Sequence, residues 1–438
     1  MPEIFNIDDF DAETRDKTFN EVLTVLYGDG YKEGEDTLRI QRERYLRLSG
    51  LFKEMYPGHG SFRIFSAPGR IEIAGNHTDH QGGRVICASV DIDVIAFAAG
   101  NDDNVIRIKS EGHSGFDVID LNVHGPAENE KGTSAALIRG VVAGFRLKGF
   151  KVGGFDAYTT SNIPKGSGLS SSAAFEILVA AILNHMYNGS SVPLLEMAKA
   201  SQYSENVYFG KPSGLMDQCG CAFGGIMTID FKDRDNAVVR PLDIDFSGSG
   251  YFPVITDTRG DHSDLTGEYT SITEDMKKTA GFFGSSLLSQ VDPDVFLARI
   301  PEAVAAVGTG PVLRAMHFFA DNDRVLKQAE ALEASDFSRF LDLINESGIS
   351  SWTLLRNIYP VSHPERQQVA LGLAVSRDQL GGNGACRVHG GGFAGTIQAF
   401  VPAGMISGYI KRMEELFGPG SSKIVRIRNM PASEPFAV

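Results

Sequence analysis

The sequence predicts an α+β protein built from two domains. Its 438 residues can bury a large core and allow two or three domains, of which we expect two. Short β-rich runs dominate residues 62–160, and helical patterns take over from Ser171 to Val207. A second half begins near Tyr251, where a strand-like run again precedes helical patterns. Strands and helices are therefore interleaved along both halves.

Two helices are expected near the start, Phe10–Leu26 and Thr37–Met55, because apolar residues recur there at three- and four-residue spacings. We interpret them as a helical cap on the first domain. The expected strands that follow are rich in β-branched and aromatic residues. They are Phe62–Ser66, Ile71–Ala74, Val85–Ala99, Val105–Lys109, Phe116–Leu121 and Phe155–Thr160. Helices Ser171–Tyr187 and Leu194–Val207 complete the first half.

The second half is expected to be mainly helical. Its strand-like runs are Phe252–Thr256, Thr396–Val401 and Ile424–Ile427. Its helical patterns are Pro311–Phe319, Asp323–Leu332, Asp336–Ser347, Glu365–Gln379 and Gly404–Phe417. No G-x-x-x-x-G-K-[ST] sequence occurs, so a Walker-type nucleotide site is disfavoured.

The composition is that of an ordinary folded protein, with 42% hydrophobic and 22% charged residues. A net charge of −14 disfavours nucleic-acid and anionic-membrane partners. The four cysteines form no C-x-x-C pair, which favours a reducing, cytoplasmic location. We expect neither a signal peptide nor a membrane span, because no uninterrupted apolar run approaches roughly 20 residues.

A glycine- and serine-rich loop, I-P-K-G-S-G-L-S-S-S-A-A at residues 163–174, leads directly into a predicted helix. Its glycines allow close approach of backbone amides, and a helix start offers unpaired N–H groups with a partial positive charge. The loop therefore favours a phosphate group. A serine that caps the helix after a glycine turn is the alternative interpretation.

A second motif, A-P-G-R-I-E-I-A-G-N-H-T-D-H-Q-G-G, occupies residues 67–83. It contains Arg70 and a run of five polar side chains, Asn76 to His80. So many donors and acceptors between strands suit the hydroxyls of a carbohydrate. Metal ligation by His77, Asp79 and His80, as in a metal-dependent hydrolase, and a simple Asx-rich turn are the alternatives.

The order of these motifs resembles the galactokinase branch of the GHMP small-molecule kinases. The resemblance runs from about Phe65 to Val401 and also includes G-L-M-D-Q, H-S-x-x-x-x-E-Y and H-G-G-G-F-x-G, at residues 214–218, 262–269 and 389–395. It implies a two-lobed α+β fold that binds ATP and a sugar in the cleft between the lobes. We accordingly expect a helical extension at residues 1–45, an N-terminal lobe at 46–248 and a C-terminal lobe at 249–438.

The resemblance also implies roles for particular residues. Asp217 would accept a proton from the anomeric hydroxyl or orient it, and Arg70 would stabilise charge on the transferring phosphoryl group. Ser172 and Glu205 would hold Mg²⁺. The triphosphate would be cradled by Gly166, Gly168, Ser170, Ser171 and Ser172, with Gly390, Gly391 and Gly392 approaching from the second lobe. The sugar-binding residues would be Asn76, His77, Asp79, Gly214 and Tyr269.

The sequence departs from the family at two positions of the sugar motif. Asn76 replaces an acidic residue that contacts the C6 hydroxyl in the family, and His80 replaces an aromatic residue. Without that negative charge, a C6 carboxylate would be rejected less strongly. We therefore expect a monomeric ATP-dependent sugar 1-kinase for galactose, with two alternatives. One is a kinase for a C6-altered or uronic sugar. The other is a non-catalytic galactose sensor, which Ser172-Ala173 disfavours.

Overall fold

The computed structural model describes residues 4–13, 17–28, 37–164, 168–211, 213–233, 236–261 and 265–436. Its first lobe is built on an eight-stranded sheet with the order β1-β2-β3-β6-β4-β5, in which β7 pairs with β3 and β8 pairs with β7. The strands are β1 Phe5–Asn6, β2 Ser61–Ala74, β3 Arg84–Gly100, β4 Val105–Ser110, β5 Asp117–Asp120, β6 Phe155–Ser161, β7 Ile226–Asp230 and β8 Val238–Leu242. The predicted α+β class is confirmed.

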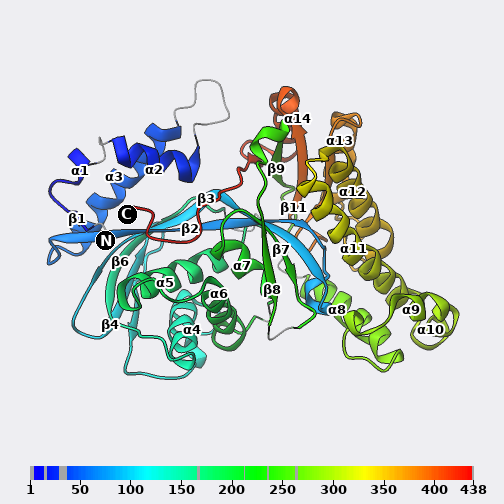
Figure 1. Ribbon diagram of the computed structural model, residues 1–438, viewed down its shortest axis with the longest axis horizontal. Helices are drawn as coiled ribbons and strands as arrows, with labels where there is room; N and C mark the ends of the chain where they lie inside the picture. Colours follow the sequence, from blue (N-terminus) through cyan, green and yellow to red (C-terminus); the bar gives the residue numbers. More distant parts are fainter. Residues whose placement is uncertain are drawn as a thin grey trace.

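Helices cover both faces of this sheet (Figure 1). One face carries α1 Phe10–Glu13, α2 Lys17–Tyr27 and α3 Thr37–Met55. The other carries α4 Ser134–Leu147, α5 Ser171–Tyr187, α6 Leu194–Tyr203 with its π-helical continuation η3 Ser204–Phe209, and α7 Met216–Ala222. Because both faces are covered, β2 and β3 are buried along most of their length and read as apolar runs.

The runs predicted as two strands, Phe62–Ser66 and Ile71–Ala74, are one continuous strand, β2. The intervening A-P-G-R segment stays in the sheet because the register with β3 shifts between Pro68 and Arg70. A second shift lies between Glu72 and Ala74. Such irregularities bend a strand and change where its side chains point, and here they flank Arg70.

The second lobe has a four-stranded sheet with the order β10-β11-β9-β12. Its strands are β9 Tyr251–Asp257, β10 Ala385–His389, β11 Thr396–Pro402 and β12 Ser422–Ile424. Its helices are α8 Thr266–Phe282, α9 Pro293–Ala298, α10 Ile300–Val307, α11 Thr309–Glu333, α12 Phe337–Ser350, α13 Gln368–Leu380 and α14 Ile406–Phe417. The two helices predicted between Pro311 and Leu332 form the single helix α11. In the described part of the chain, no helix is long and apolar enough to cross a bilayer.

The predicted domain boundaries need two corrections. The boundary at residues 45/46 falls inside α3, which packs as one helix against the first sheet. The chain also returns to the first lobe after β12, where Ser433 pairs with Ser66 and Phe436 stacks on Phe19 with ring centroids 4.6 Å apart. Figure 1 shows this last segment running back to the N-terminal helices.

A buried carboxylate, Asp93 on β3, ties these two ends of the chain to the sheet. Asp93 accepts hydrogen bonds from Arg44 of α3 at 2.7 Å and from Tyr27 of α2 at 2.7 Å. Ser66 and Arg428 complete its partners, at 2.6 and 3.3 Å. Burial alone would raise the pKa of Asp93, but the two guanidinium groups outweigh it and lower that pKa. The helical extension and the C-terminal segment are therefore parts of the first lobe.

Candidate active site

The side chains of Arg70 and Asp217 meet between β2 and the first turn of α7. Arg70 donates from Nε at 2.9 Å and from Nη2 at 2.6 Å to the same oxygen, Asp217 Oδ1. The other carboxylate oxygen accepts from Ser170 Oγ at 2.5 Å. The third guanidinium nitrogen of Arg70 donates to the carbonyl of Gly168. The predicted sugar motif, phosphate loop and G-L-M-D-Q segment thus converge on one carboxylate.

The electrostatics of this group keep Asp217 ionised. Burial would raise the pKa of Asp217, but Arg70, the Ser170 hydrogen bond and Lys211 together lower it below the ordinary value. Burial likewise works against the charge of Arg70, and Asp217 more than compensates by raising its pKa. The Asp217 side chain is still 28% exposed, whereas that of Arg70 is only 6% exposed. The carboxylate therefore faces an approachable space and the guanidinium supports it from behind.

The phosphate loop crosses from β6 to α5 and touches the second lobe. Gly168 has φ +69°, and a Cβ there would lie 2.8 Å from His389 Nδ1 and 2.7 Å from Thr396 Oγ1. Only glycine suits both the left-handed backbone and this close approach. Ser170 precedes α5 with φ 58°, an unusual conformation for a residue other than glycine. Gly166 lies outside the described residues.

The predicted metal ligands Ser172 and Glu205 lie side by side. Ser172 Oγ donates to Glu205 Oε1 at 3.3 Å, and Glu205 is 1% exposed at the start of η3. Lys211 Nζ lies 3.0 Å from the same Oε1, so a positive charge is already accommodated there. Gln218 Nε2 donates to Glu205 Oε2 at 3.0 Å. A hydroxyl and a carboxylate beside a cation-accepting position fit the oxygen ligands that Mg²⁺ prefers.

His77 of the sugar motif is neutral, and its hydrogen-bond partners determine which ring nitrogen carries the proton. Burial lowers the pKa of His77 to about 4. The Gly391 carbonyl, 2.9 Å from His77 Nε2, requires a proton on that nitrogen. His77 Nδ1 then accepts from His80 Nε2 at 3.3 Å. Asp79 lies against Gly214, where a Cβ would overlap its carboxylate, so two predicted sugar-binding residues are in contact.

Asn76, by contrast, points into the protein. Its side-chain amide donates to Glu72 Oε1 at 3.0 Å and to the Gly390 carbonyl at 2.7 Å. Its oxygen accepts from Asn357 at 2.9 Å and from Ser351 at 3.3 Å. The residue is fully buried and these four bonds use its whole hydrogen-bonding capacity. The structure therefore lends no support to a contact between Asn76 and the sugar's C6 group, which stays a prediction.

The glycine turn of the second lobe closes over the sugar motif. Gly391 contacts Tyr269 of α8 so closely that a Cβ would lie 2.6 Å from the ring. The Tyr269 hydroxyl donates to the Gly392 carbonyl at 3.0 Å. Gly390 and Gly392 have φ values of +69° and +80°. Tyr269 thus packs against and donates to the same glycine turn whose carbonyl groups accept hydrogen bonds from Asn76 and His77.

Several buried polar residues of the site were not predicted. Arg387 of β10 is fully buried, where it bonds Glu72 and the Ile73 carbonyl and joins the two lobes. Gln218 bridges Glu205 to Glu176, whose pKa is raised by burial and by Glu205. No group of three or more His, Cys, Asp or Glu residues suited to a metal occurs within the described ranges, so the metal-hydrolase alternative gains no support.

The fold and site define a class of protein, the GHMP small-molecule kinases. A family profile described as "GHMP kinases N terminal domain" matches residues 136–225, which include the phosphate loop, Glu205 and Asp217. A second, "Galactokinase galactose-binding signature", matches residues 50–100. The fold is also that of a mevalonate kinase from Methanococcus jannaschii, with a TM-score of 0.60 over 84% of this chain and 99% of the other at 15% identity.

The chain belongs to the galactokinase family. It is 32% identical to a galactokinase of Glaesserella parasuis serovar 5 over 362 residues, which cover 82% of this chain and 90% of the relative. A Streptomyces coelicolor galactokinase is 29% identical, over 86% of this chain and 94% of the relative. The structure of Lactococcus lactis galactokinase complexed with galactose matches with a TM-score of 0.75, covering 89% and 100% of the two chains at 23% identity. The protein is thus a sugar kinase.

Proposed function

We propose that this protein transfers the γ-phosphoryl group of ATP to the anomeric hydroxyl of galactose, giving galactose 1-phosphate and ADP. The observation that carries the proposal is the placement of Asp217. Its carboxylate is held by Arg70 from the sugar motif and by Ser170 from the phosphate loop. A group fixed between a sugar motif and a phosphate loop is positioned to act where the two substrates meet. Galactose is the sugar that the galactokinase relatives share.

Asp217 acts mainly by orienting the sugar hydroxyl. Phosphoryl transfer needs positioning and charge stabilisation more than a strong base, because the bond to the leaving oxygen weakens early. A carboxylate whose pKa lies below its ordinary value is a weak base that accepts a hydrogen bond throughout and takes the proton late. Arg70 keeps it ionised and places positive charge beside the transferring group.

The start of α5 is the proposed phosphate site. Backbone N–H groups at a helix N-terminus bind anions, and Ser170, Ser171 and Ser172 lie at this helix start. Ser172 and Glu205 would hold Mg²⁺, which would neutralise charge on the phosphates when bound. The sugar would lie against His77, Asp79, Gly214 and Tyr269. A monomer in the cytoplasm stays a prediction.

Product analysis tests this function directly. Purified protein is incubated with Mg-ATP and each of galactose, galacturonate, glucose and mevalonate, and the phosphorylated products are identified by ³¹P NMR. We expect a phosphate on C1 of galactose and the highest kcat/KM for that substrate. A higher kcat/KM for galacturonate would support the uronic-sugar alternative, and ligand binding without turnover would support the sensor.

The metal assignment predicts a specific effect of Glu205→Gln. A neutral amide is a poorer ligand for a hard cation, so the Mg²⁺ concentration for half-maximal rate should rise several-fold. Galactose binding measured without nucleotide should be unchanged. Glu196→Gln is the matched control, because this glutamate lies on the preceding helix and pairs with Lys148 and Lys199 on the surface. An unchanged Mg²⁺ requirement in Glu205→Gln would place this residue outside the metal site.

A further inference from the structure

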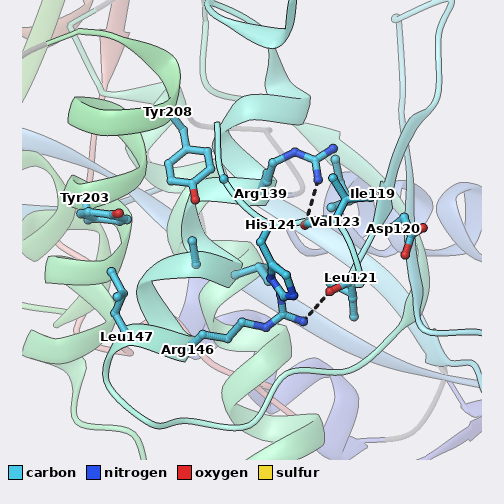
Figure 2. Close-up of a pocket in the computed structure, with 13 residues that line it drawn as sticks. Ile119, Asp120, Leu121, Val123, His124, Arg139, Arg146, Leu147, Tyr203 and Tyr208 are labelled. Carbon is cyan, nitrogen blue, oxygen red and sulfur yellow. Dashed lines mark hydrogen bonds between the residues drawn. The ribbon is translucent and has the colours of Figure 1, made fainter. Parts of the chain in front are cut away.

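A cavity of about 250 Å³ lies in the first lobe, between α4, η3 and the segment Ile119–Gly125. Figure 2 shows the side chains that line it. None of them belongs to the sugar motif, the phosphate loop or the glycine turn of the second lobe. A single water molecule needs roughly 10–15 Å³ of such cavity volume, so the cavity has room for a small organic molecule. It is separate from the proposed active site.

One wall of the cavity carries an uncompensated positive charge. Arg146 of α4 is half-buried, and its hydrogen-bond partners are the Leu121 carbonyl at 2.7 Å and Nδ1 of the His124 ring at 3.0 Å, neither of them a carboxylate. Within the described ranges no carboxylate pairs with it. Arg139, by contrast, is neutralised by two 2.7 Å bonds to Glu130. Arg146 is thus the group that would attract an anion.

A second hydrogen-bond donor, the Tyr208 hydroxyl, points into the same space. Tyr208 of η3 is 6% exposed, and its hydroxyl has no partner within the described ranges. Figure 2 shows this hydroxyl directed toward His124 and Arg146. Burial raises the pKa of Tyr208, so the hydroxyl keeps its proton and is a donor. The hydroxyl can therefore donate a hydrogen bond to a ligand oxygen in the cavity.

The remaining walls define the body of the ligand. They are mainly apolar, but also include Tyr203, Arg139 with its Glu130 partner and, at the rim, Asp120, whose carboxylate accepts from Asn122. The aromatic ring of Tyr203 stands 5.9 Å from that of Tyr208. The apolar lining consists of Ile119, Leu121, Val123, Val142, Ala143 and Leu147. The Arg146 guanidinium has no carboxylate partner within the described ranges and lies beside an acidic rim, so a ligand with a single negative charge is favoured over a phosphate dianion.

We propose that this cavity binds a small organic monocarboxylate with an apolar or aromatic body, its carboxylate bound by Arg146 and Tyr208. The site is regulatory, because Tyr208 and Glu205 share the short helix η3. Ser204 of η3 also bonds the Leu137 carbonyl of α4 at 2.6 Å. A ligand joining α4 to Tyr208 would hold η3 and thus Glu205 in place. This second part rests on the proposed role of Glu205.

Binding is tested with benzoate and phenylacetate as probes, by ligand-observed NMR on the full chain without nucleotide. Benzyl alcohol is the neutral match and inorganic phosphate the bare anion. We expect both carboxylates to bind more tightly than either control. Arg146→Gln and Tyr208→Phe should each raise the Kd of benzoate roughly tenfold, the scale of a charge-assisted hydrogen bond. Arg412→Gln and Tyr359→Phe, on exposed residues elsewhere, should leave it unchanged.

Ala143→Leu supplies an independent arm, because it fills the cavity while both polar side chains are kept, and it should abolish binding. Absence of carboxylate binding to the unaltered chain would overturn the proposal. Displacement of benzoate by ATP in the absence of Mg²⁺ would also overturn it, because the probe would then lie in the nucleotide site. If the site is regulatory, Mg-ATP lowers the Kd of benzoate, and benzoate lowers the Kd of Mg-ATP by the same factor. An unchanged benzoate affinity with Mg-ATP would overturn the regulatory part alone.

Discussion

Asp217→Asn is expected to lower kcat for galactose phosphorylation more than ~100-fold, the scale of a lost proton acceptor. The amide keeps an oxygen for the two hydrogen bonds from Arg70, which run at 2.9 and 2.6 Å. It removes the negative charge that, in the proposed mechanism, orients the sugar hydroxyl and finally receives its proton. KM for ATP should change little, because the proposed substrate contact of Asp217 is with the sugar hydroxyl. Steady-state kinetics with both substrates varied would measure this.

A matched control separates catalysis from folding. Asp230 and Arg84 form another Asp–Arg pair in the first lobe, with 2.8 Å between Arg84 Nε and Asp230 Oδ2. The Asp230 side chain is about as exposed as that of Asp217. Asp230→Asn should leave kcat unchanged. Asp217→Ala, unlike the asparagine variant, leaves the buried Arg70 guanidinium bonded to the neutral Gly168 carbonyl but without its carboxylate partner, so it should also lower the melting temperature. Full turnover in Asp217→Asn would contradict the proposed mechanism.

The pH dependence of the rate follows from the same charges. The pKa of Asp217 is lowered, so the carboxylate is already ionised at pH 5. The stabilisation from the Arg70–Asp217 pair is present above the unfolded pKa of about 3.9 and is lost as the pH falls through the folded value. We therefore expect no inflection from Asp217 between pH 5 and 8 in kcat. An inflection abolished by Asp217→Asn would show a raised pKa and a general base.

The glycine- and serine-rich loop and the start of α5 could be predicted because their sequence pattern is local, whereas phosphate binding there stays a prediction. Glycine next to a serine-rich helix start needs no distant partner to indicate an anion site, and α5 begins at Ser171 as predicted.

Helix α4 was not predicted, because the reason for its sequence lies in distant parts of the chain. Gly140 and Gly144 lower its helix propensity, yet a Cβ at these positions would lie 2.5 Å from Ser204 Oγ and 2.8 Å from Ala200 Cα. Tertiary packing, which the local pattern does not contain, explains both glycines.

The environment of Asn76 was likewise invisible in the sequence. Its backbone N–H donates to Asp321, and its side chain to the Gly390 carbonyl, 245 and 314 residues further along the chain. His317 bonds its carbonyl at 2.9 Å. A run of polar residues suggested a sugar contact equally for Asn76 and His77. Only the placement of α11 and of the glycine turn separates the two.

Asn76→Asp is expected to lower the free energy of unfolding by about 3–5 kcal/mol at pH 8, the scale of an uncompensated buried charge. The substitution is nearly isosteric, so volume does not change. It replaces the amide donor with an oxygen that faces Glu72 Oε1 and the Gly390 carbonyl, at 3.0 and 2.7 Å. The new carboxylate oxygen would then face two other hydrogen-bond acceptors at a fully buried position. Urea unfolding at several pH values would measure the loss.

The sign of the pH dependence identifies the cause. Burial and the neighbouring Glu72 should raise the folded pKa of the carboxyl introduced at position 76 above its unfolded value of about 3.9. The protonated acid can donate as the amide does, so stability should be nearly restored at pH 4 and lost as the pH rises toward the folded pKa. Asn104→Asp, at an exposed amide bonded to Asn122, is the matched control and should show no such trend.

The double variant Glu72→Gln with Asn76→Asp completes the test of this network. It restores one carboxylate and one amide across the same contact. The loss in free energy of unfolding should therefore be smaller for the double variant than the sum of the losses in the two single variants. Because Asn76 is fully bonded within the protein, the ratio of kcat/KM for galactose over galacturonate should not change in the folded Asn76→Asp variant. A shift toward galactose would instead mean that residue 76 reaches the sugar's C6 group, as the family resemblance implies, and that the lobes open further than this structure shows.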